Sequence, residues 1–239
     1  MARRTEAKQR EAGPIERAWR GVRRWLRRLV FGLVVLGALG VVLFAFVNPP
    51  TTLYIAAEKS LHGGVSHEWV DFDEIAPVMA RAVVAAEDAN FCAHWGFDMA
   101  AIRQVIAAGE RRGASTISQQ MVKNLYLWPE RSWLRKALEA LITPAVELVW
   151  SKQRILEVYL NVAEFDTAVF GIEAAAQHHF GVPAEALTPA QAARLAAVLP
   201  DPKGRSATLA TPYLERRAAS ILDGAETILR DGRSACFED

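Results

Sequence analysis

The 239-residue chain has little of what marks β-rich, repetitive or disordered proteins. No run of alternating apolar and polar residues extends beyond a few positions, which argues against a fold built mainly of strands. There is no internal repeat and no low-complexity tract. Only two cysteines occur, so at most one disulfide can form within the chain. With 51% hydrophobic residues the chain can bury one sizeable core, and its length leaves little room for a second domain.

What is present is mostly helical patterning. Alanine-rich segments at 80–86, 99–108 and 190–198 favour helix, and helical spacing alternates with short loops from Phe72 to near Asp231. We therefore predict a mostly α fold in a domain at 71–232. Residues 48–70 are expected to be a linker, with weak strand character around Leu53–Ile55, and 233–239 a loose C-terminal tail.

The N-terminus combines a basic head with a long apolar segment. Residues 1–28 hold ten Lys or Arg against three Glu, and no polar side chain occurs from Leu29 to Val47. Nineteen helical residues span about 28 Å, close to the hydrocarbon thickness of a bilayer. A cleavable signal peptide is the alternative, but its apolar core is usually about 7–15 residues long. We predict a retained transmembrane anchor at 29–47.

The basic head could also bind nucleic acid, but its place directly before the apolar segment argues against that reading. By the positive-inside rule residues 1–28 are expected in the cytoplasm, and the chain after the anchor outside. We expect no nucleic-acid partner.

The most informative stretch runs from Glu87 to Gly96. Apolar residues spaced as on one buried helix face precede it (Ile75, Val78, Met79, Ala82, Val83, Ala86). Glu87 and Asp88 therefore arrive where an anchored helix ends and the chain turns. They could be solvated charges at a helix end, or carboxylates held beside a cleft.

A second block begins at Gly113 and Ala114 and continues from Ser115 to Gln120. Thr116 and Gln119 fit a capping box that opens a helix through Leu127. Capping does not explain Ser115, Gln120 and Lys123, whereas amides and small residues at a helix start suit an anion.

Two further helices follow. Trp133–Val149 is expected to be one helix with an apolar stripe (Leu134, Leu138, Leu141, Ile142). Arg135 and Glu139 lie four residues apart at the edge of that stripe, where a simple intrahelical salt bridge is the alternative to a function. Ser151 is expected to cap the next helix. The core positions of that helix are expected to be Ile155, Leu156, Tyr159 and Leu160.

Five blocks carry a family resemblance. They are 87–96, 113–120, 135–140, 152–161 and the alanine-rich 171–176. In this order and spacing they closely resemble the peptidoglycan glycosyltransferases, the family of monofunctional transglycosylases and of the glycosyltransferase module of bifunctional penicillin-binding proteins. The resemblance covers roughly residues 70 to 200. It implies a lysozyme-like helical fold with a cleft between two lobes, behind the single N-terminal transmembrane helix.

The resemblance also implies a reaction, the polymerisation of lipid II into β-1,4-linked glycan strands with release of undecaprenyl diphosphate. Glu87 matches the general base and Asp88 its neighbour, and Glu139 matches a second functional carboxylate beside the donor. Donor sugar and diphosphate contacts are implied for Ser115, Gln120 and Lys123, and cations facing the diphosphate for Arg131, Arg135 and Lys136.

Other positions have weaker assignments. Lys152 either helps to bind the acceptor or is simply solvated. Phe91 and His94 are expected to orient the Glu87 turn, and Glu157 and Asn161 to brace the cleft. The resemblance requires no cofactor and no metal ligands of the protein, while leaving room for a divalent metal at the diphosphate.

The resemblance implies lipid II, the growing glycan strand and the bacterial inner membrane as partners, with a periplasmic catalytic domain. Other cell-wall synthesis or division proteins would be compatible partners. No Ser-x-x-Lys sequence occurs, and penicillin-binding acyl-enzyme chemistry needs that motif, so transpeptidase activity is excluded.

Two other functions stay open at this point. A lytic transglycosylase or hydrolase of lysozyme-like fold would also use a Glu in a cleft, but it has no need of the cations. A non-catalytic membrane scaffold would need neither carboxylates nor cations.

The two cysteines, Cys92 and Cys236, fall in an oxidising compartment under this topology. An even number of cysteines there favours a disulfide between them. Two unpaired buried thiols are the alternative.

Overall fold

The computed structural model describes residues 14–109 and 115–238, with side chains from Trp19 onward. The chain divides between Leu43 and Phe44 into two compact units, which are taken separately below. Gly113 and Ala114 of the second sequence block lie outside the described residues.

The first unit consists of most of helix α1 (Pro14–Phe44). Its segment Trp19–Phe44 has a mean hydropathy of 2.1. Within the described residues it is the one helix long and apolar enough to cross a membrane. This helix is consistent with the predicted single-pass anchor, although it begins before Leu29 and ends at Phe44 rather than at Val47.

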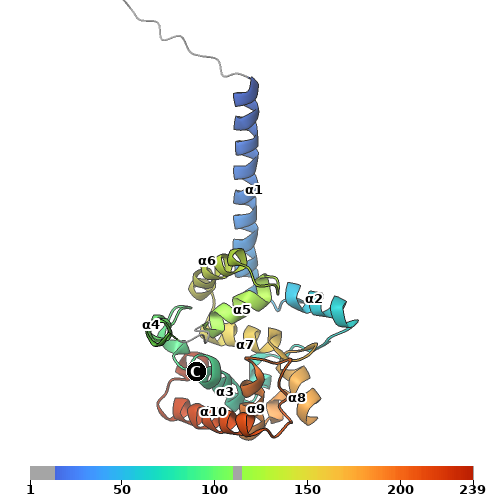
Figure 1. Ribbon diagram of the computed structural model, residues 1–239, viewed down its shortest axis with the longest axis vertical. Helices are drawn as coiled ribbons and strands as arrows, with labels where there is room; N and C mark the ends of the chain where they lie inside the picture. The colour runs from blue at the N-terminus through green and yellow to red at the C-terminus, as the bar shows by residue number, and fades with distance from the viewer. Residues whose placement is uncertain (1–13, 110–114, 239) are drawn as a thin grey trace, which may run out of the picture. The chain divides into compact units, whose positions relative to one another are not determined.

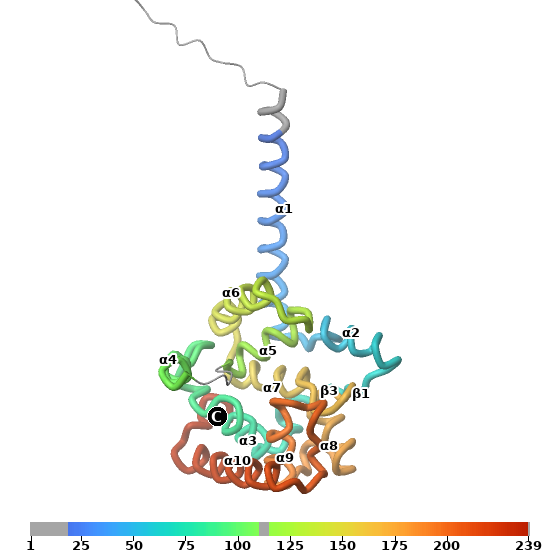
Figure 2. Tube along the Cα trace, viewed as in Figure 1, coloured from blue at the N-terminus to red at the C-terminus, as the bar shows by residue number. Residues whose placement is uncertain are grey.

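The second unit is mostly helical, as predicted (Figures 1 and 2). Its helices are α2 (Leu53–His62), α3 (Pro77–Glu87), α4 (Met99–Ala108), α5 (Ile117–Tyr126), α6 (Trp133–Val149), α7 (Lys152–Val162), α8 (Ile172–Phe180), α9 (Pro189–Val198), α10 (Pro212–Arg230) and α11 (Ala235–Glu238). Short 3-10 turns at Phe72–Glu74, Phe91–Ala93 and Ala184–Ala186 connect them.

Side-chain caps explain where several of these helices start. The predicted capping box of Thr116 and Gln119 is present at α5, and Ser151 accepts a hydrogen bond from the Arg154 amide at the start of α7. Ser132 caps α6 in the same way. Each such cap satisfies an amide that the first turn leaves without a partner, which typically contributes about 1 kcal/mol.

The helices form two packed groups. Helices α3, α9 and α10 pack on one another, and α5 packs on both α6 and α7 (Figure 1). The predicted buried face of α3 is confirmed at Met79, Ala82 and Val83. The four predicted core residues of α7, Ile155, Leu156, Tyr159 and Leu160, are also buried. The candidate carboxylates therefore come from different groups, Glu87 from the end of α3 and Glu139 from α6.

Asn161 braces the chain that enters the domain. Its side-chain amide donates to the Val70 carbonyl at 2.9 Å, and its Oδ1 accepts from the Val70 amide at 3.0 Å. The pair of bonds fixes the segment before α3 against the end of α7. The expected role of Asn161 in bracing the cleft stays a prediction.

Strand content was predicted in the wrong place. Residues 53–55 form the first turn of α2, because Thr52 caps that helix by accepting from the Ile55 amide and Ile55 is buried. A small sheet forms instead from β1 (Ser66–His67), β2 (Glu164–Asp166) and β3 (Val169–Phe170), in the order β1-β3-β2. Strands of two or three residues are too short to leave an alternating pattern in the sequence.

Helix α6 buries a largely polar face, whereas an amphipathic helix usually buries its apolar face. Its buried positions are Arg135, Glu139, Thr143 and Val146. Of the predicted apolar stripe, Leu134 and Leu141 are strongly exposed, whereas Leu138 and Ile142 are partly exposed. The neighbouring Trp133 is exposed to 92%. The buried charged face of such a helix is suited to form part of a polar site. Its exposed apolar face is suited to contact an apolar phase or partner.

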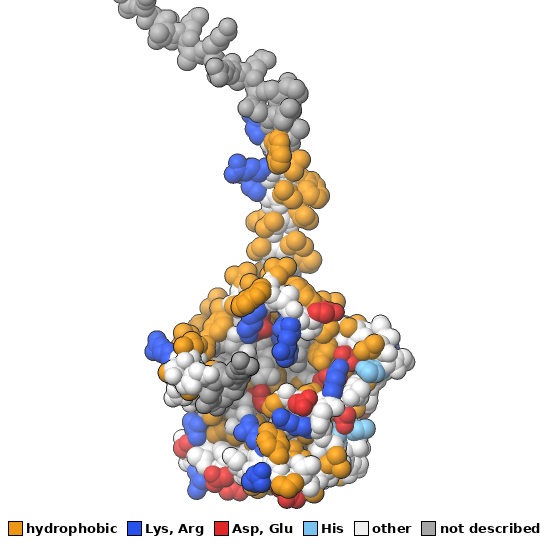
Figure 3. Space-filling model, viewed as in Figure 1, with side chains coloured by type: hydrophobic (Ala, Val, Ile, Leu, Met, Phe, Trp, Pro, Cys, Tyr) orange, Lys and Arg blue, Asp and Glu red, His pale blue; other side chains and the backbone are white. Residues whose placement is uncertain are grey.

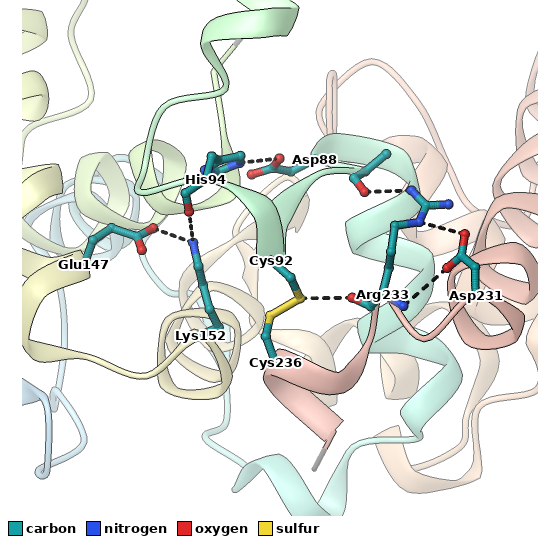
Figure 4. The surroundings of a disulfide bond; sticks show 9 residues. Asp88, Cys92, His94, Glu147, Lys152, Asp231, Arg233 and Cys236 are labelled. Atoms are coloured by element: carbon teal, nitrogen blue, oxygen red, sulfur yellow. Dashed lines mark hydrogen bonds and ion pairs between the residues drawn. A yellow bond between two sulfur atoms is a disulfide. The ribbon is translucent and has the colours of Figure 1, made fainter.

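The C-terminal segment is docked, not loose as predicted. Phe237 is 1% exposed and packs near Phe91, with ring centroids 6.3 Å apart, and Glu238 pairs with Arg81 at 2.6 Å. The favoured disulfide between Cys92 and Cys236 is confirmed, with Cα atoms 5.7 Å apart (Figure 4). The bridge ties this segment to the turn that follows Glu87.

Candidate active site

Glu87 ends helix α3 with its carboxylate half-buried and hydrogen-bonded. Gln120 Nε2 of α5 donates to its Oε2 at 2.8 Å, and the buried Tyr159 hydroxyl donates to Gln120 Oε1 at 3.3 Å. Burial raises the pKa of the Glu87 carboxyl above its ordinary value, and the Gln120 hydrogen bond and the nearby Arg217 guanidinium oppose that shift. A carboxylate with a raised pKa is suited to accept a proton near neutral pH.

Asp88 is used to hold the turn. Its Oδ1 contacts His94 Nε2 at 2.8 Å (Figure 4). Its Oδ2 accepts from the Ile117 amide at 3.0 Å, in the first turn of α5. Negative charge at a helix N-terminus is stabilising. Asp88 thus joins the end of α3 to the start of α5. This connection keeps Glu87 of α3 close to Gln120 of α5.

Gly96 lets this turn approach helix α6 closely. Its φ is +79°, and a Cβ there would lie 2.5 Å from Thr143 Cγ2. The Gly96 carbonyl accepts from the Thr116 hydroxyl at 2.6 Å, so the turn is also bound to the cap of α5. Only glycine combines this backbone conformation with this approach.

Lys152 lies beneath the same turn. Its Nζ donates to the His94 carbonyl at 2.8 Å and pairs with Glu147 at 2.9 Å (Figure 4). It also lies 4.4 Å from the centroid of the Phe91 ring. The alternative of a simply solvated lysine is therefore wrong. These contacts favour positioning of the turn over direct binding of a substrate.

Glu139 is the centre of a charged network on the buried face of α6. It is 3% exposed, and its Oε1 accepts from Gln119 Nε2 at 3.3 Å and from Lys136 Nζ. Its Oε2 lies 3.7 Å from Arg135 Nη1, and Lys136 also donates to the Ser115 hydroxyl at 3.3 Å. The salt bridge considered from the sequence is present, but it is buried and shared between two cations.

Beside this network lies a cavity of about 200 Å³, lined by Tyr54, Lys123, Asn124, Trp128, Pro129, Arg131 and Arg135. Figure 3 shows Lys and Arg side chains around a hollow in this face of the folded domain. Within the described part of the chain, Arg135 Nε and Nη1 are buried without a hydrogen-bond partner. Buried donors of this kind are costly unless an acceptor reaches them, so the cavity is suited to an anion.

Lys123 connects the two parts of the site. Burial lowers the pKa of its ammonium, with Arg135 the next cause, and the charge of Glu139 opposes the shift. Lys123 in turn acts to lower the pKa of Glu87. The ammonium is therefore within electrostatic reach of both carboxylates.

The structure brings nearly all of the sequence candidates together. Glu87, Asp88 and Gln120 form one cluster, and Ser115, Lys136, Glu139 and Arg135 form the second, with Lys123 between them. Arg131 is exposed but lines the cavity.

Sequence reasoning missed Arg217 of α10. Its guanidinium donates to the Ala86 carbonyl at 2.9 Å and acts to lower the pKa of Glu87. It is one of several charges on a long surface helix, and no pattern in the sequence distinguishes it.

Comparison with known proteins now places the chain. The transglycosylase family model matches residues 56–226, a range that includes both clusters and every cavity-lining residue except Tyr54. The chain belongs to the transglycosylase family. Proteins of this family named biosynthetic peptidoglycan transglycosylase are similar to it over most of their length. One from Jannaschia sp. (strain CCS1) is 56% identical over 237 residues, 99% of both chains.

Two enterobacterial relatives of the same name are more distant. The one from Escherichia coli O17:K52:H18 (strain UMN026 / ExPEC) is 50% identical over 84% of this chain and 88% of its own. The one from Pectobacterium carotovorum subsp. carotovorum (strain PC1) is 50% identical over 84% and 89%. The family model covers most of the folded unit.

Proposed function

We propose that the protein is a peptidoglycan glycosyltransferase that polymerises lipid II into β-1,4-linked glycan strands and releases undecaprenyl diphosphate, without transpeptidase activity. The observation that carries the proposal is a carboxylate with a raised pKa, Glu87, near a cavity lined by three cations. The name shared by its relatives supports it.

Glu87 is the general base of this proposal. Its carboxylate takes the proton of the acceptor's 4-hydroxyl as that oxygen attacks the donor sugar. The bond from Gln120 fixes one carboxylate oxygen and leaves the other for the acceptor. Asp88, His94, Gly96 and Lys152 keep the turn in place and act through Glu87.

The cation-lined cavity takes the donor's diphosphate. Negative charge grows on the leaving diphosphate as the bond between its oxygen and the anomeric carbon of the donor sugar breaks. Fixed cations stabilise that charge most in the transition state. Arg135 has two buried nitrogens, Nε and Nη1, that donate no hydrogen bond to any described residue, and Lys123 and Arg131 line the same space. The proposal assigns neutralisation of the diphosphate to these three side chains.

Glu139 holds the cations in place. Glu139 is almost fully buried and is bound to Gln119, Lys136 and Arg135. It therefore orients the N–H groups of these side chains towards the site of the lipid-linked sugar. Lys136 also donates a hydrogen bond to the hydroxyl of Ser115, which directly precedes the α5 cap, and so positions that side chain as well. A lytic enzyme, whose leaving group is a sugar, would have no use for this arrangement.

The apolar outer face of α6 suits a substrate that carries a long lipid. Trp133, Leu134, Leu141 and Leu148 are all strongly exposed on this helix. Exposed apolar surface of this kind marks contact with another apolar phase. We propose that it faces the bilayer in which lipid II is dissolved.

The proposed location is the bacterial inner membrane, with the N-terminus in the cytoplasm and the folded unit in the periplasm. The basic residues before the apolar segment of α1 favour this orientation. The Cys92–Cys236 disulfide also favours an oxidising compartment for the folded unit.

Purified full-length protein incubated with lipid II tests the proposal. A glycan polymer that a muramidase degrades, with release of undecaprenyl diphosphate, is the expected product. Cleavage of preformed glycan strands without polymerisation would instead identify a lytic enzyme, and no change in either substrate would favour a scaffold.

A further inference from the structure

A cluster of metal-ligating side chains lies outside the candidate active site. Asp166 at the end of β2 and the adjacent His178 and His179 in the last turn of α8 each offer one donor atom, and these atoms lie within 4.8 Å of one another. Helix α8 lies beside β3 (Figure 2) and packs on β2 as well. None of the three residues lines the cavity that holds Lys123 and Arg135.

The distances from the Asp166 carboxylate to the two imidazoles match those between ligands of a tetrahedral metal site. Asp166 Oδ2 lies 3.5 Å from His178 Nε2 and 3.7 Å from His179 Nε2. Ligands at about 2.1 Å from a tetrahedral zinc ion are about 3.4 Å from each other. These separations are also too long for hydrogen bonds, so Asp166 does not satisfy either imidazole in that way.

The Asp166 carboxylate is held in the orientation that such a site needs. Its Oδ1 accepts from the Thr167 amide at 2.7 Å, which leaves Oδ2 for the two histidines. The turn that provides this amide has Ala168 at a φ of +60°, an uncommon conformation for a residue with a side chain. Hydrogen bonds that fix a ligand from behind are typical of metal sites.

His179 supplies an independent sign of a missing ligand. Its side chain is 2% exposed, and within the described residues its Nε2 is buried without a hydrogen-bond partner. The backbone of Phe165 is a hydrogen-bond partner of the ring. A buried nitrogen without a partner is costly, and it faces the one oxygen of Asp166 that the backbone leaves open.

We propose that Asp166, His178 and His179 bind a divalent transition-metal ion, with zinc as the best fit. Two imidazoles and one carboxylate are borderline ligands that suit zinc better than magnesium or calcium, which prefer oxygen. A water molecule completes the coordination on the open side, since His178 is half-exposed. Both cysteines form the disulfide, so no thiolate in the described chain competes for the ion.

The site would be structural. The ion would connect the end of β2 to the end of α8. In the same strand, Glu164 accepts a hydrogen bond from Tyr54, a residue that lines the proposed diphosphate cavity. A bound ion would therefore stabilise the strand that supports Tyr54 without contacting the substrate.

Calorimetric titration of untagged, chelator-treated full-length protein with zinc chloride tests the proposal. One zinc per chain is expected, with a rise in the melting temperature of the protein when zinc is present. His178→Ala and Asp166→Asn should weaken binding at least tenfold and remove the thermal shift. Both residues are partly exposed, so these variants are expected to fold even if the buried His179 cannot be replaced.

His62→Ala is the matched control. His62 also lies near a carboxylate, 3.1 Å from Glu58, but outside the cluster. The proposal predicts wild-type zinc affinity for this variant. It is overturned if the wild-type chain takes up no zinc, or if His178→Ala and Asp166→Asn bind it as tightly as the wild type does.

Discussion

At the scale of single residues, the surroundings of Glu87 determine the pH at which it can accept a proton. Burial raises its pKa, and the hydrogen bond from Gln120 is the largest effect in the opposite direction. The base is active when ionised, so the rate should rise with pH through this raised pKa. Gln120 thereby extends the active range towards lower pH.

Gln120→Ala should move the acidic limb of the pH–rate profile to higher pH. Loss of the hydrogen bond removes an interaction that favours the ionised carboxylate, so the pKa of Glu87 rises further. Initial rates of lipid II polymerisation, measured from about pH 5 to 9, check this. The exposed Gln153 provides a control variant, Gln153→Ala. An unshifted limb in Gln120→Ala would mean that another group limits the rate.

Lys123→Ala should weaken binding of the diphosphate. A hydrogen bond to a charged group contributes about 1.5–3 kcal/mol, so inhibition by undecaprenyl diphosphate should weaken about tenfold or more. The exposed Lys59 on α2 gives the control Lys59→Ala, which removes one positive charge away from the cavity. Equal inhibition of the wild type and Lys123→Ala would remove Lys123 from the donor site.

At the scale of elements, a turn and a helix face position the site. The turn from Asp88 to Gly96 is bound to α5 through Asp88 and Thr116, and Gly96 brings it against α6. The apolar spacing of α3, the cap of α5 and the core of α7 could be predicted from the sequence, because each depends on local pattern. The orientation of α6 could not, since its buried polar face is stabilised by partners far apart in the chain, such as Gln119.

Other contacts between residues far apart in the chain could not be predicted from the sequence either. Arg217 reaches Glu87 from α10 and the short sheet joins segments about 100 residues apart. Neither follows from local periodicity. Candidate residues such as Glu87 and Lys123 could be identified from the sequence because they match the family pattern. The positioning contacts of Lys152 could be found only in the structure.

Gly96→Ala should destabilise the fold. A positive φ at a residue with a side chain costs about 1–2 kcal/mol, and the new methyl group would also overlap Thr143. Thermal unfolding of the full chain in detergent should show a melting temperature several degrees lower. Gly64→Ala is the control, because nothing lies within 4 Å of a Cβ at that position. The close approach of the turn to α6 would be disproved if the two variants were equally stable.

At the scale of the whole molecule, one covalent link connects the C-terminal segment to the turn after Glu87. The bridge between Cys92 and Cys236 closes a sequence separation of 144 residues. Phe237 and the Arg81–Glu238 pair add noncovalent contacts to the same segment. The stability of the folded unit should therefore depend on oxidation.

Cys236→Ser should lower the melting temperature clearly. Chain-entropy models give a loop of this length about 4–5 kcal/mol at most, and the remaining contacts of Phe237 reduce the loss. Wild-type protein in reductant should show the same shift, and reductant should leave Cys236→Ser unchanged. Two titratable thiols in unreduced wild-type protein would contradict the bridge.

The central claim is that Glu87 is the base of a transferase acting on lipid II, and Glu87→Gln tests it most directly. The substitution keeps the size of the side chain and removes its proton acceptance. Because burial raises the pKa of this carboxyl, ionised Glu87 destabilises the fold above that pKa, and its neutral replacement should not lower the melting temperature at neutral pH. Single-turnover polymerisation of lipid II should fall by at least 100-fold, the order of effect of a general base, in protein as stable as the wild type. A folded Glu87→Gln chain that polymerises lipid II at the wild-type rate would contradict the account.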